Sequence, residues 1–501
     1  MDSRQGSSIT ANMFLRNLRQ TRYHWKQWSR PTSRSFSSSP PPPSTTARLD
    51  YDYITSNLQS IQQNIQQRKV AGDPILVNQL HQIHRDILLQ VETMRRERNE
   101  WSSKIPTLQG NEKKNAVLRA KEIKSDLQKL EIKLKEAKQQ LQSKALELPN
   151  TTHPDTPVGS EDQAVEKNIF GTFPTFDHFE PKDHLELCQK HNLIDFEAGT
   201  IITGPKFAVL RGDLAMLELG LIAWSMQQLA AKRFVPTLVP DLCRLEMIEA
   251  CGFNPRGPES QIYGIDGNDG LGLIGTAEIP LAGLAAGRTF QEDELPSRVV
   301  GFSHAFRREA GSRGAQSKGL YRLHQFSKVE MFVHCTLEQA DHELEQLVSI
   351  QCELLQSLGL HGRVLEMPTE ELGASAHRKM DVEVWMPGRN EYGEVCSASD
   401  CTDYQSRRLD TQYVVRKNNI DNNTDQEEGD IHETHTNKNN KKNKKNKKNQ
   451  KTKLFTSTLN ATAMAVPRVM LAILETHQQS DGAIKVPEPM ISFLGKEYIG
   501  K

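Results

Sequence analysis

Two stretches with a helical repeat of apolar side chains, separated by a short run of helix breakers, constrain the fold of this chain most strongly. Their apolar residues recur at steps that align them on one helix face, in the second stretch as alternating steps of three and four. The run from Pro106 to Gly110 predicts a turn between them. Two such helices can bury their seams against each other, so we expect an antiparallel hairpin that projects as an arm. The seam positions are Leu80, Ile83, Ile87, Val91, Met94 and Trp101, then Ala116, Ala120, Ile123, Leu127, Leu130, Leu134, Ala137 and Leu141.

The predicted tip of this arm is rich in basic side chains. Glutamates are interspersed among them, which fits a solvated face with charge pairs between helices. A surface that binds nucleic acid has the same basic character, and the arm alone leaves both interpretations open. The basic residues are Arg95, Arg96, Arg98, Lys104, Lys113, Lys114, Arg119, Lys121 and Lys124.

The composition indicates extended polar segments beside at least one core. The hydrophobic fraction of the 501 residues is 36%, which is low for a wholly globular chain. The seven cysteines form no CxxC pair and no Cys/His spacing typical of zinc, so we expect reduced thiols in an intracellular compartment. No apolar run approaches the ~20 residues that span a bilayer, so we expect no membrane segment.

Two segments have a biased composition. Residues 1–48 lack acidic residues between Asp2 and the end of the segment and are rich in arginine and serine. This pattern is typical of an organellar transit peptide, with a disordered basic tail as the alternative. Residues 417–453 are almost entirely polar and end in Lys/Asn repeats, so we expect a disordered insertion, either a neutral surface loop or a loop that touches RNA.

The remaining chain has a mixed pattern of helices and strands. We expect the arm in 49–150, a proline-containing linker in 151–165 and a larger domain in 166–501. Within that domain the sequence predicts a helix at 212–233, a strand at 234–240, and an antiparallel pair of strands at 301–307 and 323–333 joined by a Gly-rich loop.

That predicted strand pair carries a set of residues suited to phosphate chemistry. Arg307 ends the first strand, and Arg322 and Phe326 lie at the start of the second. Activation of a carboxylate by ATP needs cations on the α-phosphate, where negative charge builds, and a flat surface for adenine. The pattern therefore favours an ATP-dependent ligase site.

Five motifs in order resemble class II aminoacyl-tRNA synthetases, in the form found in seryl-tRNA synthetases. Residues 306–330 resemble motif 2, and residues 460–468 resemble motif 3. The resemblance runs from Leu49 to the end of the chain, apart from the polar insertion. The other three motifs are 212–240, which resembles the dimerisation motif 1, 275–278, which resembles the serine-binding loop, and 393–408, which resembles the nucleotide-binding strand and the segment after it.

The resemblance implies an α+β fold in which an antiparallel sheet is flanked by helices, with an N-terminal coiled-coil arm. It also implies a homodimer that uses L-serine, ATP and Mg²⁺, and a serine tRNA that the arm grips by shape and backbone. In that setting the basic tip of the arm is interpreted as a tRNA-binding surface.

The resemblance also implies roles for single residues. Arg307 holds the serine carboxylate and the α-phosphate, and Phe326 and Arg468 sandwich the adenine. Glu330 and Thr462 bind the serine hydroxyl, which selects against alanine because its loss leaves buried polar groups unpaired. Arg307, Glu330 and Arg468 are the candidate catalytic residues. By the same resemblance, the serine α-amino group contacts Thr276, Ala277 and Glu278. Glu309 binds the adenine amino group and Arg322 the terminal phosphates, and further ATP contacts come from Arg308, Leu323, Val395 and Cys396. Glu394 and Ser397 hold Mg²⁺.

Some positions depart from the commonest family pattern. Ala461 and Ala463 stand where glycines are frequent, a variant similar to mitochondrial members, and Lys318 replaces a frequent arginine. With the N-terminal composition, this predicts a mitochondrial matrix protein. Two alternatives are a catalytically silent paralogue that binds RNA or acts as a scaffold, and a ligase that transfers serine to a carrier protein. The first predicts loss of Arg307, Glu330 or Arg468, and the second predicts a missing arm, whereas all of these are present.

Overall fold

The computed structural model describes residues 47–254, 260–267, 270–309, 319–415 and 452–501. The predicted presequence up to residue 46, the insertion from 417 to 451 and Lys318 therefore lie outside the described residues. Contacts divide the described chain into two compact units. One unit comprises residues 47–165 and 366–378, and the other comprises residues 166–365 and 379–501.

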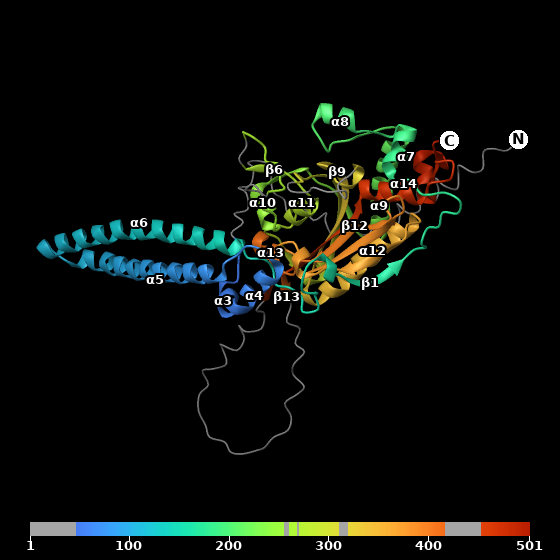
Figure 1. The fold of residues 1–501 in the computed structure, drawn as a ribbon. Coiled ribbons are helices and arrows are strands. Elements are labelled where there is room, and N and C mark those ends of the chain that lie inside the picture. The colour runs from blue at the N-terminus through green and yellow to red at the C-terminus, as the bar shows by residue number, and fades with distance from the viewer. Residues whose placement is uncertain (1–46, 255–259, 268–269, 310–318, 416–451) are drawn as a thin grey trace, which may run out of the picture. The chain divides into compact units, whose positions relative to one another are not determined.

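The first unit contains the predicted helical hairpin. Its helices α5 (Pro74–Lys104) and α6 (Gly110–Leu146) run side by side and are joined through the short 3₁₀ turn η2 (Ile105–Thr107) (Figure 1). Asp73 caps α5 by accepting a hydrogen bond from the backbone N–H of Leu76 at 2.9 Å, which satisfies an otherwise unpaired donor. Two further helices, α3 (Tyr51–Ser56) and α4 (Leu58–Arg68), complete the N-terminal part.

The hairpin buries six of the fourteen predicted seam residues fully and seven others in part. Val91, Ile123, Leu127 and Leu141 are at most 3% exposed, as the helical spacing predicts. The prediction is wrong at Ile83, whose side chain is 49% exposed. The two helices are also linked by ion pairs, from Arg95 to Glu131 at 2.7 Å and from Arg119 to Glu97 at 3.0 Å.

A buried arginine organises the base of this unit. Arg68 is 1% exposed and donates to the carbonyl oxygens of Asn150 at 2.8 Å, Gly373 at 2.5 Å and Ala376 at 3.1 Å. A guanidinium can make several such bonds from one fixed plane. Residues 366–378, distant in sequence, are held against the N-terminal helices in this way, which the sequence pattern did not indicate.

The second unit is built on an eight-stranded sheet in the order β1-β10-β11-β12-β15-β9-β8-β4. The pairs β8–β9, β9–β15 and β15–β12 are antiparallel, and the edge strand β4 pairs with β8 in parallel. The predicted antiparallel sheet is confirmed. Its strands are β1 (Val165–Phe170), β4 (Val235–Leu238), β8 (Ser297–Phe306), β9 (Gln325–Cys335), β10 (Gly362–Glu366), β11 (Arg378–Met386), β12 (Glu391–Asp400) and β15 (Ser457–Ala465).

Helices cover this sheet and complete the predicted α+β fold. The long helices α9 (Gly212–Ala231), α12 (Ala340–Ser357) and α14 (Val466–Thr476) pack on its strands (Figure 1). The shorter helices are α7 (His184–His191), α8 (Phe196–Ile202), α10 (Leu245–Ala250), α11 (Glu278–Gly283), α13 (Tyr404–Leu409) and α15 (Glu488–Leu494). The small strands are β2 (Ile194–Asp195), β3 (Val209–Leu210), β5 (Leu242–Arg244), β6 (Leu271–Leu273), β7 (Thr289–Gln291), β13 (Gln412–Val415), β14 (Thr452–Phe455), β16 (Ile484–Lys485) and β17 (Tyr498–Ile499).

Two expectations from the sequence need correction. By length and composition alone, α9 is long and apolar enough to cross a bilayer, contrary to the prediction that no apolar run approaches that length. Its Leu214, Leu217 and Leu221 are fully buried in the core, as expected of a core helix that covers a sheet. The polar insertion also ends earlier than predicted, because Thr452 and Lys453 belong to β14, where they pair with β13.

Candidate active site

The C-terminal end of β8, the start of β9 and the start of α14 surround a cleft. Much of the predicted ATP site lines it. The predicted residues in its wall are Arg307, Glu309, Arg322, Leu323, Phe326, Glu394, Val395, Cys396, Ser397, Thr462 and Arg468. The wall also includes residues that the sequence analysis did not assign to the site, namely Leu320, Tyr321, Lys328, Ala465 and Pro467.

Arg307 is the first residue after β8, where the connection from β8 to β9 begins. Its backbone N–H donates to the carbonyl of His324 at 3.0 Å, and its guanidinium carbon lies 5.2 Å from the centre of the Phe326 ring. Burial lowers the pKa of Arg307, and so does the positive charge of Arg468, although nearby glutamates oppose this. Two cations that repel each other in a buried site favour an anionic ligand between them.

Arg468 stands in the first turn of α14, following Pro467. Its Nη1 donates to Oε2 of Glu394 at 3.0 Å and to the Glu394 carbonyl at 2.9 Å, and its Nε donates to the Tyr321 carbonyl at 3.2 Å. The guanidinium carbon lies 4.5 Å from the Tyr321 ring centre. The resemblance pairs Arg468 with Phe326 around an adenine, whereas here the two arginines stack on different rings, Arg307 on Phe326 and Arg468 on Tyr321.

Glu394 supplies a carboxylate to the same cleft. Burial alone would raise its pKa, but the charges of Arg468, Lys379 and Arg307 outweigh this and hold the pKa of Glu394 well below its usual value. The group is therefore ionised at neutral pH. One carboxylate with the nearby Ser397 fits a Mg²⁺ ion that takes its remaining ligands from phosphate oxygens and water. Among the described residues, no group of three His, Cys, Asp or Glu side chains is arranged to hold a metal by itself.

A second polar cluster lies deeper, where β9 faces β15. Glu330 is 1% exposed; its Oε2 is 2.7 Å from Nζ of Lys328 and accepts a hydrogen bond from Oγ1 of Thr462 at 3.3 Å. Lys328 also donates to Oγ1 of Thr276 at 3.1 Å. The strand register makes Thr462 and Glu330 direct cross-strand partners, and the ladder shifts by one residue at Ala463. The regular register from Ser457 to Thr462 therefore brings Thr462 to Glu330, and the β-bulge follows directly after this pair.

Glu278 begins α11 behind this cluster. It is 5% exposed, and its Oε1 accepts hydrogen bonds from the side-chain amides of Gln405 at 2.7 Å and Asn460 at 3.0 Å. Burial and the charge of Glu330 raise the pKa of Glu278 to about 7, against the opposing charge of Lys328. It therefore titrates close to neutral pH, unlike Glu394.

Several predicted residues do not line the cleft itself. Thr276, Ala277, Glu278 and Glu330 are buried and do not belong to the cleft wall, and Thr276 and Glu330 contact Lys328. The backbone N–H of Arg308 donates to the carbonyl of Gln261 at 3.0 Å, and its side chain is not part of the wall. Their assigned roles stay predictions.

Glu309 and Arg322 contact each other at 3.2 Å across the mouth of the loop. The resemblance assigns these two side chains to opposite ends of a nucleotide. A partly exposed ion pair of this kind is weak, so a ligand can replace it. Arg322 would then contact a phosphate of the ligand in place of Glu309.

Comparison with known proteins gives a consistent result. The profile of the tRNA synthetase class II core domain (G, H, P, S and T) matches residues 262–424, and that of the seryl-tRNA synthetase N-terminal domain matches residues 49–152. The serine–tRNA ligase of Treponema denticola is 40% identical over 90% of this chain and 100% of its own length. The mitochondrial serine–tRNA ligase of Mus musculus is 41% identical over 76% of this chain and 68% of its own length.

Solved structures agree with these relatives. The seryl-tRNA synthetase from Pyrococcus horikoshii complexed with ATP has a TM-score of 0.75 and is 29% identical, covering 90% of this chain and 99% of that chain. The cytoplasmic serine–tRNA ligase of Naegleria fowleri in complex with AMP, at 24% identity and a TM-score of 0.72, has the same fold. The Treponema denticola and Pyrococcus horikoshii proteins match over 99% or more of their own length, and both parts of the chain match the corresponding profiles. The chain belongs to the seryl-tRNA synthetase family.

Proposed function

We propose that this chain joins L-serine to the 3′ end of tRNA(Ser) in two steps. In the first, a serine carboxylate oxygen attacks the α-phosphorus of ATP, the bond to the β-phosphate oxygen breaks, and pyrophosphate leaves. In the second, a hydroxyl of the terminal tRNA ribose attacks the acyl carbon of seryl-adenylate and AMP leaves. The observation that carries this proposal is the pair of guanidiniums, Arg307 and Arg468, in one cleft beside the ionised Glu394.

Arg307 and Arg468 act by positioning and by charge neutralisation. Arg307 is suited to bridge the serine carboxylate and the α-phosphate, because a guanidinium offers several donors in one plane. Phe326 and Tyr321 supply aromatic faces beside these two cations for a nucleobase. Mg²⁺ held by Glu394 and Ser397 would neutralise phosphate charge.

The deeper cluster is suited to serine. Thr462 and Glu330 would donate to and accept from the substrate hydroxyl, and Lys328 holds the Glu330 carboxylate in place through an ion pair at 2.7 Å. Thr276, Ala277 and Glu278 would face the α-amino group, for which an ionised Glu278 provides the counter-charge. Discrimination against alanine follows because these buried polar groups lack a partner without the hydroxyl.

The helical hairpin would bind the tRNA, and the functional unit would be a homodimer. The basic residues near the turn of the hairpin, among them Arg96, Lys113 and Lys114, are exposed and suited to phosphate contacts.

We also propose a mitochondrial role. The acid-poor, Arg-rich composition of residues 1–48, the Ala461 to Ala463 segment and the similarity to the mouse mitochondrial enzyme support it. Fusion of residues 1–48 to a fluorescent reporter tests this proposal: matrix localisation supports it, and a diffuse signal identical to that of the reporter alone contradicts it.

The enzymatic proposal is tested by ATP–pyrophosphate exchange with protein that starts at Ser37, with alanine, threonine and glycine as controls. Exchange with serine alone, lost in Glu330→Ala, supports seryl-adenylate formation. A second assay measures the transfer of serine from seryl-adenylate to tRNA(Ser). Acylation of tRNA(Ser) in this assay distinguishes the proposed enzyme from a ligase that transfers serine to a carrier protein. Absence of exchange from folded protein with Mg-ATP would instead favour the silent RNA-binding paralogue.

A further inference from the structure

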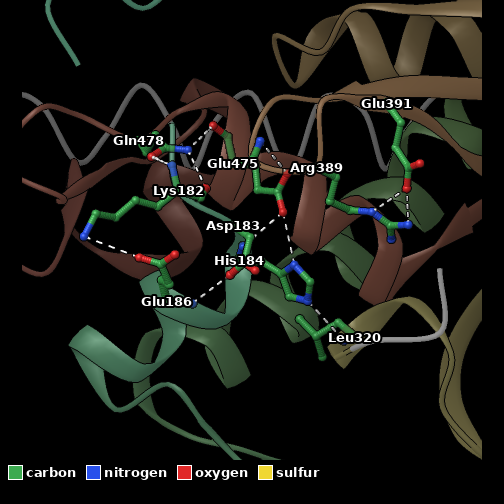
Figure 2. A network of polar contacts seen from close by, with 10 residues as sticks. Lys182, Asp183, His184, Glu186, Leu320, Arg389, Glu391, Glu475 and Gln478 are labelled. Atoms are coloured by element: carbon green, nitrogen blue, oxygen red, sulfur yellow. Dashed lines mark hydrogen bonds and ion pairs between the residues drawn. The ribbon is translucent and has the colours of Figure 1, made fainter. Parts of the chain in front are cut away.

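A buried histidine–glutamate pair lies behind the cleft. His184 is 2% exposed and Glu475 is fully buried. Oε1 of Glu475 lies 3.1 Å from Nδ1 of His184 and accepts from the backbone N–H of the same residue at 3.0 Å. Oε2 accepts from the backbone N–H of Gly388 at 3.0 Å. One carboxylate thus holds two chain segments, as Figure 2 shows.

The other ring nitrogen of His184 reaches the active-site loop. The backbone N–H of Leu320 donates to Nε2 at 3.4 Å (Figure 2). A carboxylate only accepts and an amide N–H only donates, so the neutral tautomer with its proton on Nδ1 satisfies both partners. The imidazole therefore connects α14, through Glu475, to the short 3₁₀ turn η6 (Gly319–Tyr321).

Two glycines allow these segments to approach so closely. Gly319 has φ of +62°, and a Cβ built on it would lie 2.3 Å from Nε2 of His184. A Cβ on Gly388 would lie 2.3 Å from the carbonyl oxygen of Lys182. Any larger residue at either position would force the backbone or the imidazole to move.

The segment that carries His184 has anchors of its own. The side-chain amide of Gln478 accepts from the backbone N–H of Lys182 at 2.8 Å and donates to its carbonyl at 2.9 Å. Further along α7, Nε2 of His191 lies 2.7 Å from the carbonyl of Gly482. These bonds hold α7 in place independently of the His184 imidazole. The imidazole can therefore serve to position η6.

The turn η6 forms part of the cleft wall, where its Leu320 and Tyr321 lie with Arg468. Two guanidiniums stack on the Tyr321 ring, that of Arg389 at 4.3 Å and that of Arg468 at 4.5 Å from the ring centre. Arg468 and Glu475 are seven residues apart on α14, about two turns, and so lie on one side of that helix. The helix thus reaches η6 twice, directly through Arg468 and indirectly through Glu475 and His184.

We propose that His184 and Glu475 are positioning residues for ATP, which fix η6 so that Tyr321 and Arg468 stay aligned for the nucleotide. This rests on the proposed function, since it takes the cleft beside Arg468 as the ATP site. Within the described residues, the side-chain hydrogen bonds of the pair go to each other, to Gly388 and to Leu320, and none goes to the deeper Glu330 cluster. The pair therefore acts on ATP binding and leaves serine binding unchanged.

Two substitutions of His184 separate positioning from a purely structural role. An Asn side chain places its amide nitrogen near the Nδ1 position and keeps the bond to Glu475, but it does not reach Leu320. A Gln side chain places its amide oxygen near the Nε2 position and keeps the acceptor for Leu320. In ATP–pyrophosphate exchange we expect His184→Asn to raise the KM for ATP roughly 3- to 10-fold with an unchanged serine KM, and His184→Gln to stay near the wild-type value. Equal losses of kcat and Tm in both variants, with both KM values unchanged, would overturn the proposal.

A pair of glycine variants gives the same test without altering the histidine. Gly319 and Gly495 both have left-handed φ angles, +62° and +70°, but a Cβ on Gly495 meets nothing within 4 Å. Gly319→Ala should raise the KM for ATP and Gly495→Ala should not, and this pair decides the outcome if His184→Asn does not fold. Arg468→Ala is the reference: an unchanged KM for ATP there refutes the assignment of the cleft. If the KM for ATP rises in Arg468→Ala but stays unchanged in both His184→Asn and Gly319→Ala, the cleft remains the ATP site and only the positioning role is refuted.

Discussion

At the scale of single residues, serine selection depends on the hydroxyl of Thr462. Thr462→Val keeps the shape of the side chain but removes the donor to Glu330. We expect the KM for serine to rise roughly 10-fold, with an equal loss of preference for serine over alanine, because one buried hydrogen bond is lost. Steady-state exchange assays with both amino acids measure this. Thr462→Ser restores the hydroxyl and should restore the preference; if it behaves as Val does, the hydroxyl is not the selecting group.

A second residue-scale prediction concerns pH. The pKa of Glu278 is raised to about 7 by burial and by Glu330, so acidification protonates the proposed partner of the serine ammonium group. The KM for serine should rise roughly 8-fold between pH 7.5 and 6.0 while the KM for ATP stays constant. Glu278→Gln should abolish this dependence and have a high serine KM throughout; a persisting pH profile in that variant would assign it to another group.

The same raised pKa has the opposite effect on stability. In the unliganded protein, folded Glu278 keeps its proton up to about pH 7, whereas an unfolded glutamate loses it near 4.5. The folded state thus binds more protons between these values, so this contribution to stability is complete below about pH 4.5 and is lost as the pH rises to about 7. Acid therefore stabilises the protein through Glu278 while it weakens serine binding.

Local patterns predicted the elements better than the contacts between them. The apolar repeat identified α5 and α6, and the alternation of strands and turns identified β8 and β9. The role of Lys328 was missed because it depends on Thr276, which lies 52 residues away in sequence. Tyr321 was missed because its contacts with Arg389 and Arg468 depend on tertiary packing, including that of α14 on η6. Such proximity is set by sheet register and tertiary packing, which periodicity does not encode.

At the scale of elements, we expect the arm to contribute to tRNA binding and not to the formation of seryl-adenylate. Lys113 and Lys114 begin α6 near the turn of the hairpin and are exposed. Their double substitution by Ala should lower kcat/KM for tRNA acylation about 10-fold and flatten its salt dependence, because phosphate contacts release counterions. Exchange without tRNA should not change. Lys138 and Lys144, at the other end of the same helix, form the control pair; an equal effect of their substitution would make the loss non-specific.

At the scale of the whole molecule, the large sheet ends in an edge that a second copy would cover. The edge strand β4 carries Leu238, which is 82% exposed, and α9 beside it exposes 61% of Leu219. Unpaired edges and large exposed apolar side chains are typical of assembly surfaces. They coincide with the segment that resembles motif 1, which supports the proposed homodimer.

Light scattering tests this assembly. We expect the wild-type protein to have the mass of two chains of 56.7 kDa each, and Leu219→Lys with Leu238→Lys to shift it toward one, since two charges would be buried without partners. Activity should fall with the dimer fraction and recover at high protein concentration. Leu337→Lys is the matched control, because Leu337 is 62% exposed on η7 (Leu337–Gln339), outside motif 1. A double variant that remains dimeric would place the interface elsewhere, and a monomeric, fully active wild-type protein would refute the homodimer.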